Sequence, residues 1–234
     1  MQIILNKRPK SPIIINGFPG FGLVSIISTE FLISHLNAKP IGYFWSDKLS
    51  PFIALHDSKI LDPLGIFYDA KDNIVIVHAM SPIQGLEWEL ADAVVQLCKQ
   101  LKAKELISLE GVASKETTVN PYYYTNIEKR RKEFDKMGIK PLKEGLVVGV
   151  TGALLLKAKD ISFSSVFVEA HTNIADSEAA AKIIQVLDKY LGLKVDYKPL
   201  LTVAKEFEGK LKGLMEKTKE TVDQKEKREL NYLG

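Results

Sequence analysis

Four polar residues fall where an α/β protein usually binds ligands. Glu110, Thr151, Glu169 and His171 each follow an apolar run that predicts a β-strand. The carboxyl ends of parallel strands lie along one edge of a sheet, and ligands usually bind at that edge. A pair formed by Glu169 and His171 could transfer protons, because imidazole titrates near neutral pH. No nucleophile in a tight turn accompanies them, so we favour the interpretation that they are polar loop residues that bond turn amides.

A glycine-rich turn offers a second candidate site. Gly17, Gly20 and Gly22 stand between an apolar run at residues 13–15 and a stretch with helical spacing at residues 23–36. Backbone amides at such a helix start can hold a phosphate. However, the glycine spacing differs from the dinucleotide fingerprint, Pro19 lacks an amide donor, and the lysine of a nucleotide-binding loop is absent. We therefore favour a tight turn with positive φ and close packing of the helix on the strand.

The remaining histidines and the single cysteine do not suggest a metal site. His35, His56 and His78 are scattered without the spacing of metal ligands, and they are interpreted as residues at the ends of helices or strands. Cys98 lies on the apolar stripe of a predicted helix, so it is expected to be an inert core thiol. A lone cysteine excludes an intrachain disulfide and a thiolate zinc cluster. We expect no metal and no cofactor.

Aromatic and basic residues occur together in one segment, a pattern that can bind RNA. Tyr122, Tyr123 and Tyr124 precede a basic run at residues 129–132. Glu128 and Glu133 dilute that run, so a solvated helix face or a protein interface explains the pattern at least as well. The nucleic-acid interpretation stays open as a third alternative.

These candidates must be positioned by alternating strands and helices. Short apolar runs predict strands at residues 13–15, 41–45, 52–56, 60–68, 73–79, 106–109, 146–150 and 166–168. Amphipathic spacing predicts helices at residues 23–36, 86–101, 126–137 and 177–191. Glu110-Gly111 is expected to form a turn, Ser177 to cap the last helix, and Gly192 to end it. The pattern predicts a three-layer α/β/α fold with a mostly parallel sheet.

The composition changes near residue 200. Residues 205–234 hold 8 basic and 7 acidic side chains. A narrow apolar stripe runs through this segment, and such a stripe must be covered by the globular body or by a second copy of the chain. We expect a core domain at residues 1–200 and a charged C-terminal helix with a flexible tail at residues 201–234. The expected oligomer interface consists of Phe207, Leu211, Leu214 and Met215.

The bulk properties exclude several classes of partner. The chain has 234 residues and a net charge of only +3, so no field demands a nucleic acid or an anionic membrane. No run approaches the ~18 apolar residues of a membrane-spanning helix, and no signal peptide is visible. We expect a cytoplasmic protein without a nucleic-acid or membrane partner.

Several sequence blocks carry a resemblance to a known family. Asn-Gly-Phe-Pro-Gly-Phe-Gly-Leu-Val at residues 16–24 and Gly-Leu-Val-Val-Gly-Val-Thr-Gly at residues 145–152 form two glycine signatures. Tyr-Thr-Asn at 124–126, Asp-Ser-Glu-Ala-Ala at 176–180 and Leu-Gly-Leu-Lys-Val-Asp at 191–196 follow the same order. These blocks, spread over residues 10–200, resemble the archaeal homologues of proteasome assembly chaperone two.

This resemblance implies a fold like that of nucleoside phosphorylases, without a demonstrated catalytic site. It also implies a homo-oligomer that binds the proteasome core particle as an assembly chaperone or an activator-like protein. In such proteins a C-terminal tail, ending in a hydrophobic residue, a tyrosine and any residue, enters pockets between proteasome α-subunits.

The tail of this chain departs from that pattern. Tyr232 is third from the end, and Leu233 occupies the tyrosine position. The expected partner-binding residues are Leu230, Asn231, Tyr232, Leu233 and Gly234. We predict a non-enzymatic chaperone; the leading alternative is a hydrolase or phosphorylase-like enzyme that acts on a nucleoside-like ligand through Glu110, Glu169 and His171.

Overall fold

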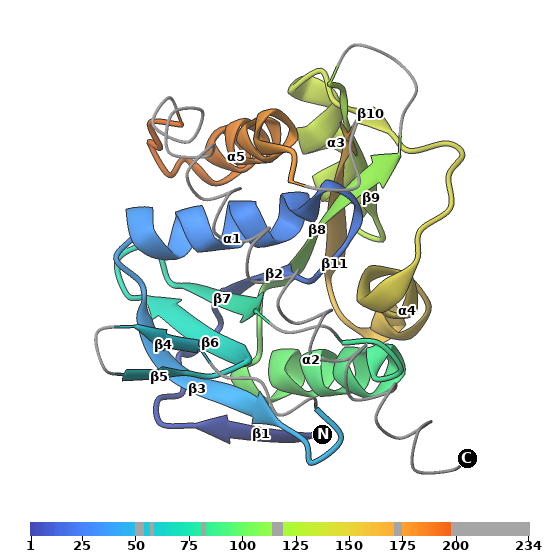
Figure 1. Ribbon diagram of the computed structural model, residues 1–234. Helices are drawn as coiled ribbons and strands as arrows, with labels where there is room; N and C mark the ends of the chain where they lie inside the picture. The colour runs from blue at the N-terminus through green and yellow to red at the C-terminus, as the bar shows by residue number, and fades with distance from the viewer. Residues whose placement is uncertain (50–53, 57–58, 81–82, 114–118, 171–174, 198–234) are drawn as a thin grey trace, which may run out of the picture.

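The structure is a computed structural model, shown as a ribbon in Figure 1. It describes residues 1–49, 54–56, 59–80, 83–113, 119–170 and 175–197. The predicted C-terminal extension lies outside the described residues. The same holds for His171 and for every expected interface and tail residue, namely Phe207, Leu211, Leu214, Met215, Leu230, Asn231, Tyr232, Leu233 and Gly234.

Strands and helices alternate along the chain. The strands are β1 (Gln2–Leu5), β2 (Ile13–Gly17), β3 (Lys39–Trp45), β4 (Ala54–His56), β5 (Lys59–Leu61), β6 (Leu64–Asp69), β7 (Ile74–Ala79), β8 (Glu105–Ala113), β9 (Pro121–Thr125), β10 (Lys140–Pro141) and β11 (Phe163–Ala170). The helices are η1 (Phe21–Leu23), α1 (Val24–His35), α2 (Glu87–Leu101), α3 (Glu128–Lys136), α4 (Gly149–Lys157), η2 (Ala158–Asp160) and α5 (Ser177–Leu191).

Nine of the strands form one sheet in the order β1-β3-β6-β7-β2-β8-β11-β9-β10. The four central strands, β7, β2, β8 and β11, run parallel to one another. Strands β1, β3 and β6 add to one side in antiparallel fashion, and β9 pairs antiparallel with β11 on the other. The sheet is therefore parallel at its centre and mixed overall. The predicted α/β class is confirmed.

Helices cover both faces of the sheet, as Figure 1 shows. Side chains alternate along each central strand, so Ile15 and Ile107 pack with α1 and α5, whereas Ile14 and Leu106 pack with α2 and α4. All four are fully buried. This alternation assigns Asn16, Ser108, Glu110 and Glu169 to the α2 and α4 face, because each lies an even number of residues from a residue of that face.

The strand predicted at residues 146–150 is wrong. Leu146 is 93% exposed and Val148 is 77% exposed, in a segment without regular structure, and α4 begins at Gly149. Gly149 has φ 71°, a conformation that stops extended structure. The place beside β11 that such a strand would need is taken by β9.

The turn predicted at Glu110-Gly111 is also wrong, because β8 continues through both residues to Ala113. Gly111 serves a different purpose. A Cβ atom at this position would overlap the backbone carbonyl of Phe21, so the missing side chain lets the glycine-rich turn approach the strand.

The N-cap of the last helix lies one residue before the predicted Ser177. Asp176 is the N-cap, and its Oδ1 accepts a hydrogen bond of 3.0 Å from the amide of Ala179, whereas Ser177 is the first helical residue. Gly192 ends the helix with φ 70°, as predicted.

A buried ion pair joins two helices to the sheet at the amino end of β8. Glu105 is 1% exposed and lies 2.9 Å from Nε of Arg130 on α3. Its carboxylate also accepts hydrogen bonds from Ser164 Oγ at 2.5 Å and from the Tyr190 hydroxyl at 3.0 Å. Burial raises the pKa of Glu105, while Ser164, Arg130 and Tyr190 lower it.

Candidate functional site

The candidate site lies at the carboxyl ends of the central strands. The chain leaves β2 through α1 toward β3 on one side of the sheet, and it leaves β7 through α2 toward β8 on the other. In the strand order, β2 leads toward β3 on one side and its neighbour β8 leads toward β9 and β11 on the other, so the connections diverge between β2 and β8. In open α/β sheets this arrangement usually opens a crevice for a ligand.

The glycine-rich turn that follows β2 packs closely against α1. Gly22 has φ 66°, and Gly17 lies so close to α1 that a Cβ would sit 2.7 Å from the side chain of Thr29. The Ser25 hydroxyl donates a hydrogen bond back to the carbonyl of Phe18. The predicted tight turn with positive φ and close helix packing is confirmed.

A carboxyl group lies against this turn. Glu110 projects from β8 toward Gly20, and any Cβ at Gly20 would overlap Oε1 of Glu110. Glu110 is 7% exposed. The Glu110 carboxyl therefore occupies the space that a side chain at position 20 would take.

Glu110 ends a chain of hydrogen bonds that crosses three elements. Asn16 Nδ2 donates to Ser108 Oγ at 3.0 Å, and the hydroxyls of Ser108 and Thr151 lie 3.0 Å apart. Thr151, in the first turn of α4, in turn hydrogen-bonds the Glu110 carboxyl. All four side chains are buried. The fold thus brings together Glu110 and Thr151, two of the residues predicted to lie at the ends of strands.

The Glu110 carboxyl is protonated near neutral pH. Burial raises its pKa to about 8, and the hydrogen bonds from Thr151 and the Gly111 amide offset only part of that effect. A neutral carboxyl group can both donate and accept a hydrogen bond. Here the carboxyl group links β8 to α4 through the hydrogen bond with Thr151, and it packs against the glycine-rich turn at Gly20.

Glu169 is held by other partners. Its Oε2 accepts hydrogen bonds from the amide and side chain of Asn120 at 3.1 and 2.8 Å, and its Oε1 accepts one from the Tyr122 hydroxyl at 3.2 Å. It therefore fastens β11 to β9. Because His171 lies outside the described residues, the predicted pairing with Glu169 stays a prediction.

His78 forms a polar cluster with α1 on the opposite face of the sheet. Its Nδ1 lies 2.8 Å from Thr29 Oγ1 and its Nε2 lies 3.3 Å from Glu30 Oε2. Burial lowers the pKa of His78 to about 4, so the ring is neutral at pH 7. The interpretation as a strand-end residue placed it correctly but missed these partners.

The other single residues have structural surroundings. His35 is exposed and stacks on Phe31, with 5.7 Å between ring centroids. Cys98 is buried, and burial raises the pKa of its thiol to about 12, so it stays protonated. The side chain of His56 lies outside the described residues. Across the described ranges, no group of three His, Cys, Asp or Glu side chains could hold a metal ion.

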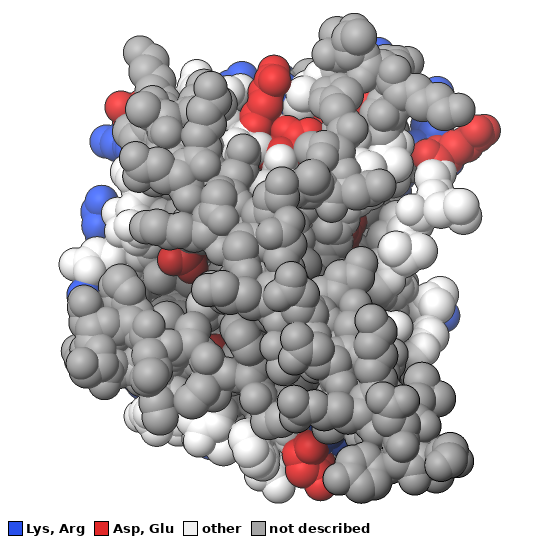
Figure 2. Space-filling view, in the orientation of Figure 1, with Lys and Arg blue, Asp and Glu red and all other residues white. Residues whose placement is uncertain are grey.

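The aromatic and basic segment is largely engaged in internal contacts. Tyr123 is buried and stacks on Phe134 with 4.7 Å between centroids, while Tyr124 is 42% exposed. On α3, Arg130 pairs with Glu105 and Glu133, and residues 131 and 132 pair with Glu128. On the face shown in Figure 2, the described basic side chains lie dispersed near the edge of the view. A stacking platform for RNA needs free rings and cations, and this segment provides few.

Four apolar side chains on α4, in the segment before it and on β9 are exposed, and the sequence did not indicate this. They are Leu146, Val148, Leu156 and Tyr124, exposed at 93, 77, 59 and 42%, and are referred to together as the apolar surface beside α4. A groove of about 250 Å³ runs between Tyr124 and the segment before α4. An apolar run of β-branched residues in the sequence gives no sign of such exposure, because it is equally typical of a buried strand.

No helix in the described ranges combines the length and apolar character needed to cross a membrane.

Comparison with known proteins gives consistent matches over most of the chain. The model of the PAC2 family matches residues 14–215. A protein of Methanocaldococcus jannaschii is 31% identical over 214 residues, which cover 88% of this chain and 87% of the relative. The crystal structure of Pyrococcus furiosus PbaA, an archaeal homologue of a proteasome-assembly chaperone, superposes with a TM-score of 0.84. It shares 31% identity, with 94% of this chain and 98% of PbaA covered.

A second P. furiosus protein shares the fold. The structure of PbaB, an archaeal proteasome activator, has a TM-score of 0.73 and 23% identity, with 92% of this chain and 98% of PbaB covered.

Proposed function

Because the chain belongs to the PAC2 family, we propose that it is a non-enzymatic chaperone that binds the proteasome core particle as a homo-oligomer. The observation that carries the proposal is the match to PbaA, a proteasome-assembly chaperone homologue, at 31% identity over 94% of this chain. Identity at that level over nearly the whole length supports a related function as well as a related fold.

The candidate site supports binding rather than catalysis. The Glu110 carboxyl is buried against Gly20 and hydrogen-bonded to the Thr151 hydroxyl, and it does not line the groove beside Tyr124. The Glu169 carboxylate accepts hydrogen bonds from Asn120 and Tyr122. The exposed apolar surface beside α4 is, in contrast, of the kind that soluble proteins use to contact other proteins.

We place the contact with proteasome α-subunits in the C-terminal tail, Leu230, Asn231, Tyr232, Leu233 and Gly234. Self-association would use the apolar stripe of the extension, Phe207, Leu211, Leu214 and Met215. Several tails on one oligomer would raise the effective concentration at neighbouring pockets, so weak single contacts would add up to useful avidity.

A capture experiment with proteasome core particles tests both parts. The intact chain is compared with a chain cut after Lys219, which lacks all five tail residues. We expect the intact chain to bind and the shortened chain to bind weakly. Equal binding by both contradicts the tail mechanism, and binding by neither contradicts the partner assignment.

The oligomer is tested by mass in solution. We expect a multimer for the intact chain and a smaller species for a Phe207→Ser/Leu211→Ser double variant. The matched control replaces Lys205 and Lys212 with Ser on the same segment. A monomeric intact chain that still binds core particles would remove the avidity argument and leave the partner assignment standing.

The enzyme alternative has its own readout. Thermal unfolding is followed with a panel of nucleosides and phosphates. A clear shift that is abolished by Glu169→Ala would favour a ligand-processing enzyme over a chaperone.

A further inference from the structure

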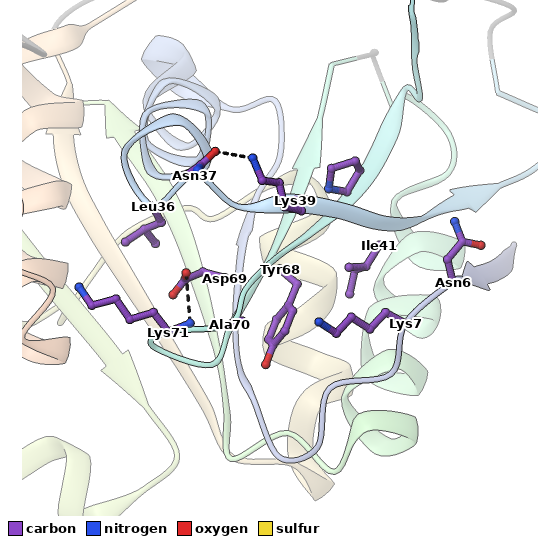
Figure 3. A pocket seen from close by; sticks show the side chains of 11 residues that line it. Asn6, Lys7, Leu36, Asn37, Lys39, Ile41, Tyr68, Asp69, Ala70 and Lys71 are labelled. Carbon is purple, nitrogen blue, oxygen red and sulfur yellow. Dashed lines mark hydrogen bonds between the residues drawn. The ribbon is translucent and has the colours of Figure 1, made fainter.

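A second pocket lies at the opposite end of the sheet from the glycine-rich turn. It has a volume of about 470 Å³ and is bounded by the β1–β2 connection, the end of α1 with the start of β3, and the β6–β7 turn (Figure 3). This volume falls within the range of ~300–1,000 Å³ that is usual for small-molecule sites. Its described lining residues come from these three segments alone.

Three lysines line this pocket against one carboxylate. Lys7, Lys39 and Lys71 come from three separate segments, and Asp69 is the acidic lining residue. Asp69 is only 7% exposed, and its two oxygens accept hydrogen bonds from the backbone amides of Lys71 at 3.3 Å and Asp72 at 2.7 Å. The carboxylate is thus used to hold the β6–β7 turn.

The lysine ammonium groups lack acidic partners in the described part of the chain. No described carboxylate forms a salt bridge with Lys7, Lys39 or Lys71. Three cations and one occupied carboxylate give the lining a formal charge of +2. A lining with this excess of positive charge favours an anionic ligand.

Two of the lysines contact neighbouring side chains of the pocket lining. Lys39 Nζ donates to Asn37 Oδ1 at 2.5 Å, which leaves the side-chain amide N–H groups of Asn37 as donors. Lys7 Nζ lies 4.8 Å from the centroid of the Tyr68 ring, and Figure 3 shows the two side chains next to each other. The apolar parts of the lining, Leu36 and Ile41 among them, provide a surface for an uncharged portion of a ligand.

We propose that this pocket binds a phosphorylated small molecule, with the phosphate held by the ammonium groups of Lys7 and Lys39 and the organic portion against Leu36 and Ile41. Ammonium groups bind phosphate oxygens as point charges, and charge-assisted hydrogen bonds are the strong ones. None of the described lining residues belongs to the apolar surface beside α4.

Calorimetric titration of the full chain with adenosine monophosphate, inorganic phosphate, adenosine and citrate tests the proposal. We expect both phosphate compounds to bind, the nucleotide more tightly, and adenosine and citrate to bind far more weakly. Lys7→Gln and Lys39→Gln are each expected to weaken nucleotide binding about tenfold, the effect of one charge-assisted hydrogen bond.

Lys99→Gln is the matched control, because it removes the same charge from an exposed position on α2. It is expected to leave the affinity unchanged. The proposal is overturned if neither phosphate compound binds, if adenosine or citrate binds as well as the nucleotide, or if Lys99→Gln weakens binding as much as Lys39→Gln. Circular dichroism of each variant confirms that the fold is retained.

Discussion

Replacing Glu110 with Gln should change the way stability depends on pH. In the native protein burial raises the pKa of this carboxyl to about 8, from an ordinary value of 4.5. The native state therefore keeps a proton on Glu110 that the unfolded chain has already lost. Glutamine is close in shape to a neutral carboxyl group and does not titrate.

The sign and size of the effect follow from proton linkage. Stabilisation by protonated Glu110 is fully present below pH 4.5 and is lost as the pH rises through 8. Between these values the unfolded state binds one proton fewer, so the free energy of unfolding falls by about 1.4 kcal/mol per pH unit. The full window corresponds to a loss on the order of 5 kcal/mol.

A second buried group acts in the opposite direction over part of this range. The pKa of His78 is lowered from 6.5 to about 4, so the unfolded chain binds the extra proton between these values. Its contribution makes stability rise with pH up to 6.5. The two slopes nearly cancel between pH 4.5 and 6.5, and the wild-type protein should lose stability between pH 6.5 and 8.

The difference between wild type and variant isolates Glu110. Urea unfolding, followed by tryptophan fluorescence at intervals from pH 5 to 9, gives both curves, and every other titrating group cancels on subtraction. The wild-type stability relative to Glu110→Gln should fall by about 1.4 kcal/mol per pH unit up to pH 8 and then level off. Glu144→Gln, at an exposed position, should run parallel to wild type. A constant difference between wild type and Glu110→Gln from pH 5 to 8 would refute the reasoning.

Three further substitutions test the packing by the same urea assay. Gly20→Ala should lower the free energy of unfolding by about 1–3 kcal/mol, because the new methyl group overlaps the Glu110 carboxyl; a loss below 0.5 kcal/mol would show that the turn is loose. Arg130→Ala should cost about 3 kcal/mol, more at pH 8 than at pH 5, since it leaves Glu105 buried without its cation; a loss independent of pH would contradict this. Leu146→Ser should change the free energy of unfolding by less than about 0.5 kcal/mol, because the side chain is 93% exposed. A loss of about 2 kcal/mol or more would instead indicate that Leu146 is buried, as the strand predicted from the sequence requires.

The sequence was sufficient for the central layers because their pattern is governed by burial. Continuous apolar runs such as Ile74–Ala79 predicted strands covered on both faces, and the stripe of α2 predicted the helix that covers them. Burial depends mainly on residue type, so these elements appear in the sequence at nearly their observed bounds.

Predictions failed where tertiary contacts decide the local structure. The apolar run at residues 146–150 has strand propensity, but β9 already pairs with β11, and Gly149 adopts a positive φ that begins α4. Gly111 was interpreted as a turn residue, although the role of a glycine in a close approach looks the same in a sequence. Neither case can be resolved without knowing which element lies opposite.

The residues of the candidate site could be predicted from the sequence better than the hydrogen bonds that join them. Glu110 and Thr151 were both named from their positions after apolar runs, and they do meet. Their link through Ser108 to Asn16 depends on β2 and β8 being neighbours, which requires the strand order. The pocket lined by Lys7, Lys39 and Lys71 could not be predicted for the same reason, because the three lysines are far apart in the sequence.

The edge of the sheet at β10 limits how copies of the chain can join. This strand has only two residues, Lys140 and Pro141, and it is the last strand on that side. Proline offers no amide hydrogen, and a lysine at an outermost strand discourages another backbone from adding to the ladder. Among the described strands, this edge is therefore poorly suited to extending the sheet into a second copy of the chain, and we expect any contact on that side to be made by side chains.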